Sequence, residues 1–190
     1  KRRVVVTGLG LISPIGNSAV SSWKNATEGK SGAELITKFD TENFLTKFGA
    51  TVKNFEDLGC IEPKEARRTD LFIQYGTAAA IEAIEDSGFI DFYNSKDIGV
   101  SVSSGIGGLE TIEENAIILM EKGPRKISPF FVPGSIINMA SGNIAIKYGF
   151  QGPNLSMVSA CSSAGHSIGY SARSISYGDA DVMVAGGTEA

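Results

Sequence analysis

The chain has 190 residues, 42% of them hydrophobic and 20% charged, with 17 basic and 21 acidic side chains for a formal net charge of −4. This composition is typical of one folded domain and argues against a disordered chain or a nucleic-acid-binding protein, which normally carries a basic stripe. No stretch approaches the ~18 apolar residues of a membrane span. Because no secretory signal follows the basic start, we expect a cytoplasmic protein without membrane insertion.

The inventory of metal-ligating side chains is small. Cys60 and Cys161 are the two cysteines, and His166 is the single histidine. A four-ligand zinc site cannot be assembled from these residues, so we expect no metal. Two isolated thiols indicate a reduced intracellular protein, with one long-range disulfide as the alternative.

Glycine punctuates the chain, with 23 residues where average usage of ~7% would give about 13. Most glycines lie between periodic segments, as in short strands joined by tight turns to helices. In chain order we predict a strand at 3–7, a helix from Asn17 or Ser18 to about 28, a strand at 48–53 and a largely buried helix from Thr69 or Asp70 to 87. A strand at 98–102, an amphipathic helix at 107–122 and a helix at 133–148 are predicted next. The last predicted elements are a strand at 155–158, a helix at 162–177 and a strand at 181–185. This alternation predicts βαβ units in a doubly wound α/β sheet, within one domain.

Charge is unevenly spread along the chain. Residues 127–190 hold five charged side chains, which are Lys147, Arg173, Asp179, Asp181 and Glu189. Such a segment is typical of a central core, and an interface with another subunit is the alternative.

The segment 155–166 (LSMVSACSSAGH) is the most informative part of the chain. It places Cys161 where a predicted strand turns into a helix, and every residue from 159 to 165 other than the cysteine is small. A nucleophile elbow has this pattern, and the free N–H groups of the helix start favour a thiolate and could hold an oxyanion. A buried structural thiol is the alternative reading of the same pattern.

His166 follows Cys161 by five residues, which is ~500° of helical rotation and leaves the two side chains about 140° apart. We therefore expect His166 to have a core or supporting role. If Cys161 needs an imidazole base, that base lies outside these 190 residues.

Five ordered blocks carry a family signal, and they are residues 2–10 (RRVVVTGLG), 104–108 (SGIGG), 123–133 (GPRKISPFFVP), 160–163 (ACSS) and 177–187 (YGDADVMVAGG). In these blocks the chain resembles the amino-terminal half of β-ketoacyl-[acyl-carrier-protein] synthases of the type II class (3-oxoacyl-ACP synthase II), in the thiolase-like superfamily of condensing enzymes. The resemblance implies a layered α/β/α fold with a mixed, mostly parallel sheet. It also implies that Cys161 is the nucleophile and that residues 1–190 form the first of two similar halves.

The resemblance further implies fatty-acid chain elongation. An acyl group passes from acyl carrier protein to Cys161 as a thioester, malonyl-carrier protein loses carbon dioxide, and the resulting carbanion attacks the acyl-enzyme to give 3-oxoacyl-carrier protein. Acyl carrier protein and a second copy in a homodimer are the implied partners, with no cofactor. In the family two histidines, a lysine and part of the oxyanion hole lie in the second half, so we expect residues 1–190 alone to be inactive.

Further positions match the family's substrate site. Ile106 matches the residue that gates the acyl pocket, with a plain loop aliphatic as the alternative. Phe131 and Val132 match a dimer contact that shapes the partner's acyl pocket, with ordinary packing as the alternative. Ala160 would border the same pocket.

Lys64, Arg67 and Arg68 form a basic cluster in an acidic chain. In the family such a patch docks the acidic carrier protein, which agrees with electrostatic steering. A solvated surface is the alternative. We expect Cys60, which follows an acidic stretch, to be structural.

Three other functions are partly compatible with these residues. Gly8 and Gly10 after a predicted strand suggest dinucleotide binding, but Ser13 and Pro14 disagree with that fingerprint. A chain-length-factor-like partner subunit would lack the nucleophile, so Cys161 counts against it. Another ketoacyl synthase class or a polyketide synthase domain is the main alternative.

Overall fold

The computed structural model describes residues 1–190, apart from the side chain of Asp57. Its α-helices are α1 (Ala19–Thr27), α2 (Pro63–Ala66), α3 (Leu71–Ser87), α4 (Leu109–Lys122), α5 (Phe131–Ser135), α6 (Met139–Tyr148) and α7 (Ser163–Tyr177). The strands are β1 (Ala33–Leu35), β2 (Phe48–Ala50), β3 (Ile98–Ser103) and β4 (Val182–Gly187). Short 3₁₀ turns are η1 (Glu56–Leu58), η2 (Ile90–Phe92), η3 (Ser95–Asp97), η4 (Pro124–Lys126) and η5 (Ala160–Ser162). Among the helices described, none is both long and apolar enough to cross a membrane.

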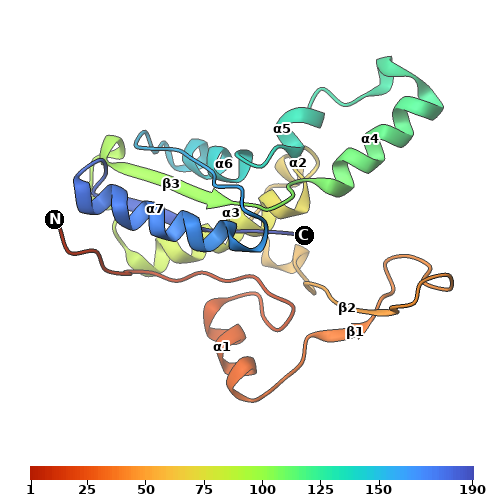
Figure 1. The fold of residues 1–190 in the computed structure, drawn as a ribbon, viewed down its shortest axis with the longest axis horizontal. Helices are drawn as coiled ribbons and strands as arrows, with labels where there is room; N and C mark the ends of the chain where they lie inside the picture. The colour runs from red at the N-terminus through yellow and green to blue at the C-terminus, as the bar shows by residue number, and fades with distance from the viewer.

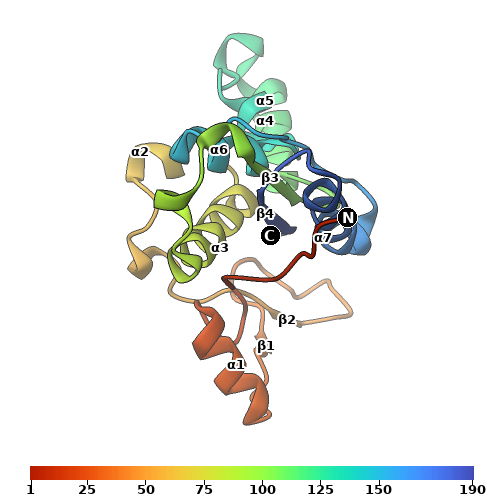
Figure 2. The ribbon, with the colours of Figure 1, turned by 90° about the vertical axis from the view of Figure 1, so that its left-hand side faces the viewer.

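A parallel pair of strands, β3 and β4, lies between two helical layers (Figure 1). Figure 2 shows α7 on one face of this pair and α3 with α6 on the other. All six residues of β3 are buried, which is typical of a strand covered on both faces. The core joins α3 and α6 to the strand pair through Phe72, Ile73, Ile84, Ile98, Val100, Ala140, Ile144 and Val184. The predicted α/β/α layering is therefore confirmed.

The sheet is narrower than the predicted doubly wound one. In the part of the chain that the structure describes, hydrogen-bonded strands form two pairs, β3 with β4 and the antiparallel β1 with β2. The strand predicted at 48–53 is the shorter β2, and its partner β1 was not predicted. The strands predicted at 98–102 and 181–185 are confirmed as β3 and β4.

Helix α3 begins and ends as its sequence predicts. The Asp70 side chain accepts a hydrogen bond from the Phe72 N–H at the first turn, and Gly88 ends the helix with φ of +60°. The helix buries side chains on several sides, as its apolar girth predicted. Helix α1, capped by Ser18, and helix α7, ended by Gly178, also confirm their predictions.

The strand predicted at 3–7 is wrong. This segment is irregular and continues along α3, where the N–H groups of Leu9 and Leu11 donate to the carboxylates of Asp86 and Glu82, each at 2.9 Å. Gly10 lies so close that a Cβ there would stand 1.9 Å from a carbonyl oxygen of α3. Residues 3–7 belong to neither hydrogen-bonded strand pair of the described structure, and the Arg2 N–H just before them donates to the Ser176 carbonyl of α7 at 3.2 Å.

The strand predicted at 155–158 is also wrong. Backbone hydrogen bonds join this segment to β3 only around Val100, whose N–H donates to Pro153 and whose carbonyl accepts from Leu155. Further along, the Met157 N–H donates to the Ser103 hydroxyl at 2.7 Å instead of to a backbone carbonyl. Serine side chains thus replace the ladder.

Two predicted helices differ in detail. The helix predicted at 133–148 is split into α5 and α6, because Ile136 adopts an extended conformation with ψ of 142°. The helix predicted at 107–122 is present as α4, but its apolar side faces outward: Leu109, Ile112 and Leu119 are 57%, 43% and 49% exposed.

Candidate active site

Cys161 lies in a sharp turn where the segment beside β3 enters α7. The turn is the 3₁₀ segment η5, and the sulfur belongs to a free, exposed cysteine. Ala160, directly before it, has φ of +51°, a left-handed conformation that residues other than glycine rarely adopt. Strained backbone next to a reactive side chain is typical of nucleophile elbows.

The Ser163 side chain forms hydrogen bonds with the backbone of this turn. Its hydroxyl accepts a hydrogen bond from the Ser159 N–H at 2.9 Å and donates one to the Ala160 carbonyl at 2.7 Å. The two bonds join the backbone on both sides of the strained residue, and the Ser163 side chain is buried. Ser163 therefore stabilises the conformation that presents Cys161.

His166 supports the turn and does not pack in the core. Its Nδ1 lies 2.5 Å from the Ser159 hydroxyl, and its side chain is exposed. The expected core position is wrong, because the helix turns this residue toward solvent and toward the start of the Cys161 turn. The supporting position agrees with the rotation argument.

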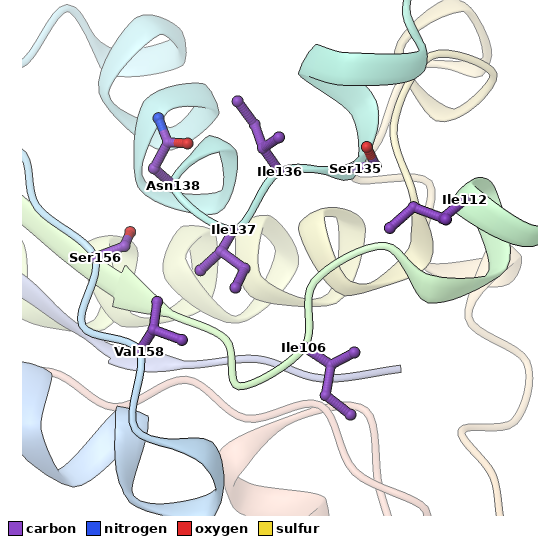
Figure 3. A pocket seen from close by; sticks show the side chains of 8 residues that line it. All are labelled: Ile106, Ile112, Ser135, Ile136, Ile137, Asn138, Ser156 and Val158. Carbon is purple, nitrogen blue, oxygen red and sulfur yellow. The ribbon is translucent and has the colours of Figure 1, made fainter.

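The loop between β3 and α4 meets the Cys161 turn. A Cβ at Gly105 would stand 3.0 Å from the Ala160 carbonyl oxygen, so the two backbones are in close contact. Ile106, next in the loop, lines an open cavity of about 370 Å³. Figure 3 shows Ile106 on this loop and Val158 on the segment that leads to Cys161, at the edge of the same cavity.

The cavity is largely aliphatic. Its lining consists of Ile106, Ile112, Ser135, Ile136, Ile137, Asn138, Ser156 and Val158 (Figure 3). A cavity of this kind fits a hydrocarbon chain better than a charged ligand. Sequence reasoning named Ile106 and missed the others. The signal that could have found them is the pair Ile136–Ile137, two adjacent aliphatic residues at a helix break.

The other expected substrate residues lie beside this cavity and not in its lining. Phe131 is half-buried and Val132 is 56% exposed on α5, which leads into the lining residues Ser135–Asn138. Ala160 is exposed and contacts the Ile106 loop at Gly105.

The three side chains of the predicted basic cluster are exposed and lie in α2 or directly after it. Lys64 lies in this helix, Arg67 ends it, and the Arg68 guanidinium lies 4.3 Å from the centroid of the Phe130 ring. The Asp70 N–H donates to the Gly134 carbonyl at 3.0 Å, so the cluster is joined to α5. The structure thus brings the basic cluster next to the helix that leads to the cavity.

Cys60 has a different environment from Cys161. It is partly buried, and burial raises the pKa of its thiol, with a smaller raising effect from Glu65. A thiol with a raised pKa is a poor nucleophile near neutral pH, in agreement with the expected structural role.

The chain is similar to known proteins along its whole length. The family model for the β-ketoacyl synthase N-terminal domain matches residues 1–190. Curated relatives named 3-oxoacyl-[acyl-carrier-protein] synthase 2 are 55% identical in Vibrio cholerae serotype O1 and 50% identical in Coxiella burnetii, each over 100% of this chain. The chain spans 46% of the length of these relatives.

Solved structures agree with this assignment. The ishigamide ketosynthase/chain length factor superposes with a TM-score of 0.90 at 29% identity, over 100% of this chain and 48% of that chain. A type II polyketide synthase acyl-carrier protein in complex with its ketosynthase, bound to the hexaketide, gives a TM-score of 0.83 at 26% identity, over 98% of this chain and 51% of that chain. These matches confirm the thiolase-like fold. With the family model covering every residue, the chain belongs to the N-terminal domain family of the β-ketoacyl synthases.

Proposed function

We propose that residues 1–190 form the nucleophile-bearing half of a 3-oxoacyl-acyl-carrier-protein synthase, and that a second, similar half completes the active site. The observation that carries this proposal is the exposed Cys161 in a strained turn whose backbone contacts the loop of an aliphatic cavity. The names of relatives at 50–55% identity support the same reaction.

In the proposed first step the Cys161 thiolate attacks the carbonyl carbon of an acyl thioester on acyl carrier protein. The carrier's sulfur leaves as a thiolate and takes up the proton that the Cys161 thiol has given up, and the acyl group remains on Cys161. In the second step malonyl-carrier protein loses carbon dioxide, and the carbanion attacks the acyl-enzyme. The sulfur of Cys161 then leaves, and the product is a 3-oxoacyl thioester two carbons longer. A sulfur that both attacks and leaves readily divides one difficult bond formation into two easier steps.

The acyl chain would occupy the cavity beside Ile106, with Ala160 at its border, while Phe131 and Val132 would contact a second copy and help shape that copy's acyl pocket. Acyl carrier protein would dock at Lys64, Arg67 and Arg68, since all three are exposed and α5 joins their position to the cavity. The solved complex of a related ketosynthase with its carrier protein supports this kind of partner.

A homodimer is part of the same proposal. The outward apolar side of α4 offers Leu109, Leu119 and Met120, of which Met120 is 87% exposed. Apolar surface of this kind is typical of an interface. Changing Leu119 to Glu should shift the complete protein toward monomer in sedimentation, and an unchanged dimer would argue against this surface.

The function is tested by product formation in the complete protein. With acyl- and malonyl-loaded carrier protein, the unaltered protein should form 3-oxoacyl-carrier protein, Cys161→Ala should form none, and the matched control Cys60→Ala should remain active. Activity that survives Cys161→Ala would reject the proposed nucleophile. Residues 1–190 alone should form no product.

A polyketide-type condensation is the alternative, because solved ketosynthases of that kind share the fold. Their identity to this chain is 26–29%, against 50–55% for the fatty-acid relatives, so fatty-acid elongation is favoured.

A further inference from the structure

The loop that carries Ile106 is held by a carboxylate from the far end of the chain. Glu189 accepts a hydrogen bond from the Ser104 hydroxyl at 2.7 Å and another from the Gly105 N–H at 2.8 Å. The Ser104 oxygen in turn accepts from the Gly107 N–H at 2.8 Å. Glu189 and Ser104 together therefore fix the backbone on both sides of Ile106.

Glu189 is itself held in place by the residue before it. The Thr188 N–H donates to the Ser103 carbonyl at 2.8 Å, and the Thr188 hydroxyl donates to the Phe72 carbonyl at 2.6 Å. The Thr188 methyl packs against Gly76, where a Cβ would stand 2.9 Å away. The Glu189 backbone thus continues from β4 along the end of β3 on a fixed path.

The opposite side of the loop contacts the reaction site. Gly105 touches the Ala160 backbone, which precedes Cys161. The Gly108 N–H donates to the Ser135 carbonyl at 2.9 Å, and Gly107 lies against Ile137. Ser135 and Ile137 both line the cavity. The loop therefore contacts Glu189, the lining of the cavity and the Cys161 turn.

Removal of the Glu189 carboxylate would take away the acceptor of the Ser104 hydroxyl and of the Gly105 N–H. Ser104 is 1% exposed, so its hydroxyl has little access to water as a replacement acceptor. Hydrogen bonds to a charged acceptor are among the stronger ones in proteins, and a buried donor without a partner is costly. The loop would then move, and Ile106 with it.

We propose that Glu189 is a positioning residue that sets the place of Ile106 at the cavity wall and thereby determines which acyl chains Cys161 accepts. This inference rests on the proposed function. Glu189 is not among the residues that line the cavity beside Ile106, and it acts through the Ser104–Gly107 backbone.

The test measures acyl transfer to Cys161 in the complete protein, as kcat/KM for carrier protein loaded with a butyryl or a dodecanoyl chain. Glu189→Ala should change the ratio of the two values by about tenfold, the scale of one charge-assisted hydrogen bond. Glu189→Gln should change it less, because its amide oxygen still accepts from the Gly105 N–H. The control Glu113→Gln, an exposed carboxylate on α4, should leave the ratio unchanged.

A double mutant separates positioning from general stability. If Glu189 acts through Ile106, then Ile106→Ala combined with Glu189→Ala should give the same ratio as Ile106→Ala alone, whatever the change in Tm. Additive effects, or an unchanged ratio in both Glu189 variants while Cys161 is still acylated, would overturn the inference. Absence of any acyl transfer to Cys161 in the unaltered protein would instead overturn the proposed function, and this inference with it.

Discussion

At the scale of single residues, the conformation of Ala160 depends on its neighbours. A left-handed alanine costs free energy and persists where surrounding contacts fix it. Here the Ser163 hydroxyl bridges the Ser159 N–H and the Ala160 carbonyl, and the Ser159 side chain meets His166. The turn is therefore held by polar contacts on both sides of the cysteine.

Ser163→Ala should destabilise the protein by about 1–3 kcal/mol, since two partly buried hydrogen bonds to the backbone are lost, each worth about 0.5–1.5 kcal/mol. Acylation of Cys161 should slow as well, because the turn is then free to relax. Ser162→Ala is the matched control, since Ser162 is exposed and its side chain makes no cap hydrogen bond. Urea unfolding and acyl-transfer rates check both effects; equal behaviour of the two variants would contradict the role of Ser163.

The two cysteines should differ in their reaction with iodoacetamide. Cys161 is exposed and should be alkylated first, whereas Cys60 is partly buried with a raised pKa and should react readily only at higher pH. The same raised pKa implies that the contribution of Cys60 to stability is complete below the unfolded thiol pKa of ~8.5 and falls as the pH rises above it. Peptide mapping after alkylation at several pH values measures the order, and faster labelling of Cys60 would be the contrary result.

At the scale of elements, the Asp70 carboxylate connects α3 and α4. It caps α3, and its other oxygen accepts from the Thr111 N–H at 3.1 Å and the Thr111 hydroxyl at 2.7 Å in α4. Asp70 directly follows the short basic segment around α2. The carboxylate therefore fixes the basic cluster relative to the loop and helix that border the cavity.

Asp70→Ala should lower the free energy of unfolding by about 2–3 kcal/mol, the sum of a lost helix cap and a lost buried polar contact. Glu62→Ala is the control: Glu62 occupies the N-cap position of α2 without a cap hydrogen bond, and its loss should cost less than about 0.5 kcal/mol. Thermal or denaturant unfolding compares the two, and similar losses would refute the bridging role.

The basic cluster of Lys64, Arg67 and Arg68 should affect how the complete enzyme binds carrier-bound substrate. Replacing Lys64, Arg67 and Arg68 with Ala should raise the KM for carrier-bound substrate by about tenfold or more at low salt, while a free acyl thioester should react as before. The difference should shrink as salt is added, because exposed charges are screened. An equal rise in KM for the carrier-bound substrate and the free thioester would indicate that the substitutions damage the active site and do not act on carrier docking.

How far the sequence predicts the elements depends on where their hydrogen bonds lie. Helices α3 and α7 are specified locally by Asp70, Gly88 and Gly178, so their ends were predictable. The segments at 3–7 and 155–158 have strand-like composition, but 3–7 belongs to neither strand pair, and the Met157 N–H bonds to the Ser103 hydroxyl, which no local pattern reveals.

The residues of the candidate site also divide into those that a local pattern predicts and those that only the tertiary fold brings together. Cys161 and Ile106 were predictable because the first lies in a recognisable turn and both lie in family motifs. The contact of Gly105 with Ala160, and of Glu189 with Ser104, joins residues 55 or more positions apart. Such contacts follow from the tertiary fold and not from periodicity.

At the scale of the whole molecule, the described chain leaves much apolar surface uncovered. The segment at 3–7 exposes Val5 and Val6 at 60% and 78%, and α4 exposes its apolar side. The chain also spans 46% of its curated relatives. Both observations agree with the proposal that these surfaces pack against a second half and a second copy.

The central claim is that Cys161 carries the acyl group during the reaction. The most direct measurement is mass spectrometry of the complete protein after incubation with acyl-loaded carrier protein, followed by peptide mapping. One acyl group per chain is expected, attached to the peptide that contains Cys161 and absent from Cys161→Ala. An acyl group on any other residue, or an equal adduct in Cys161→Ala, would contradict it.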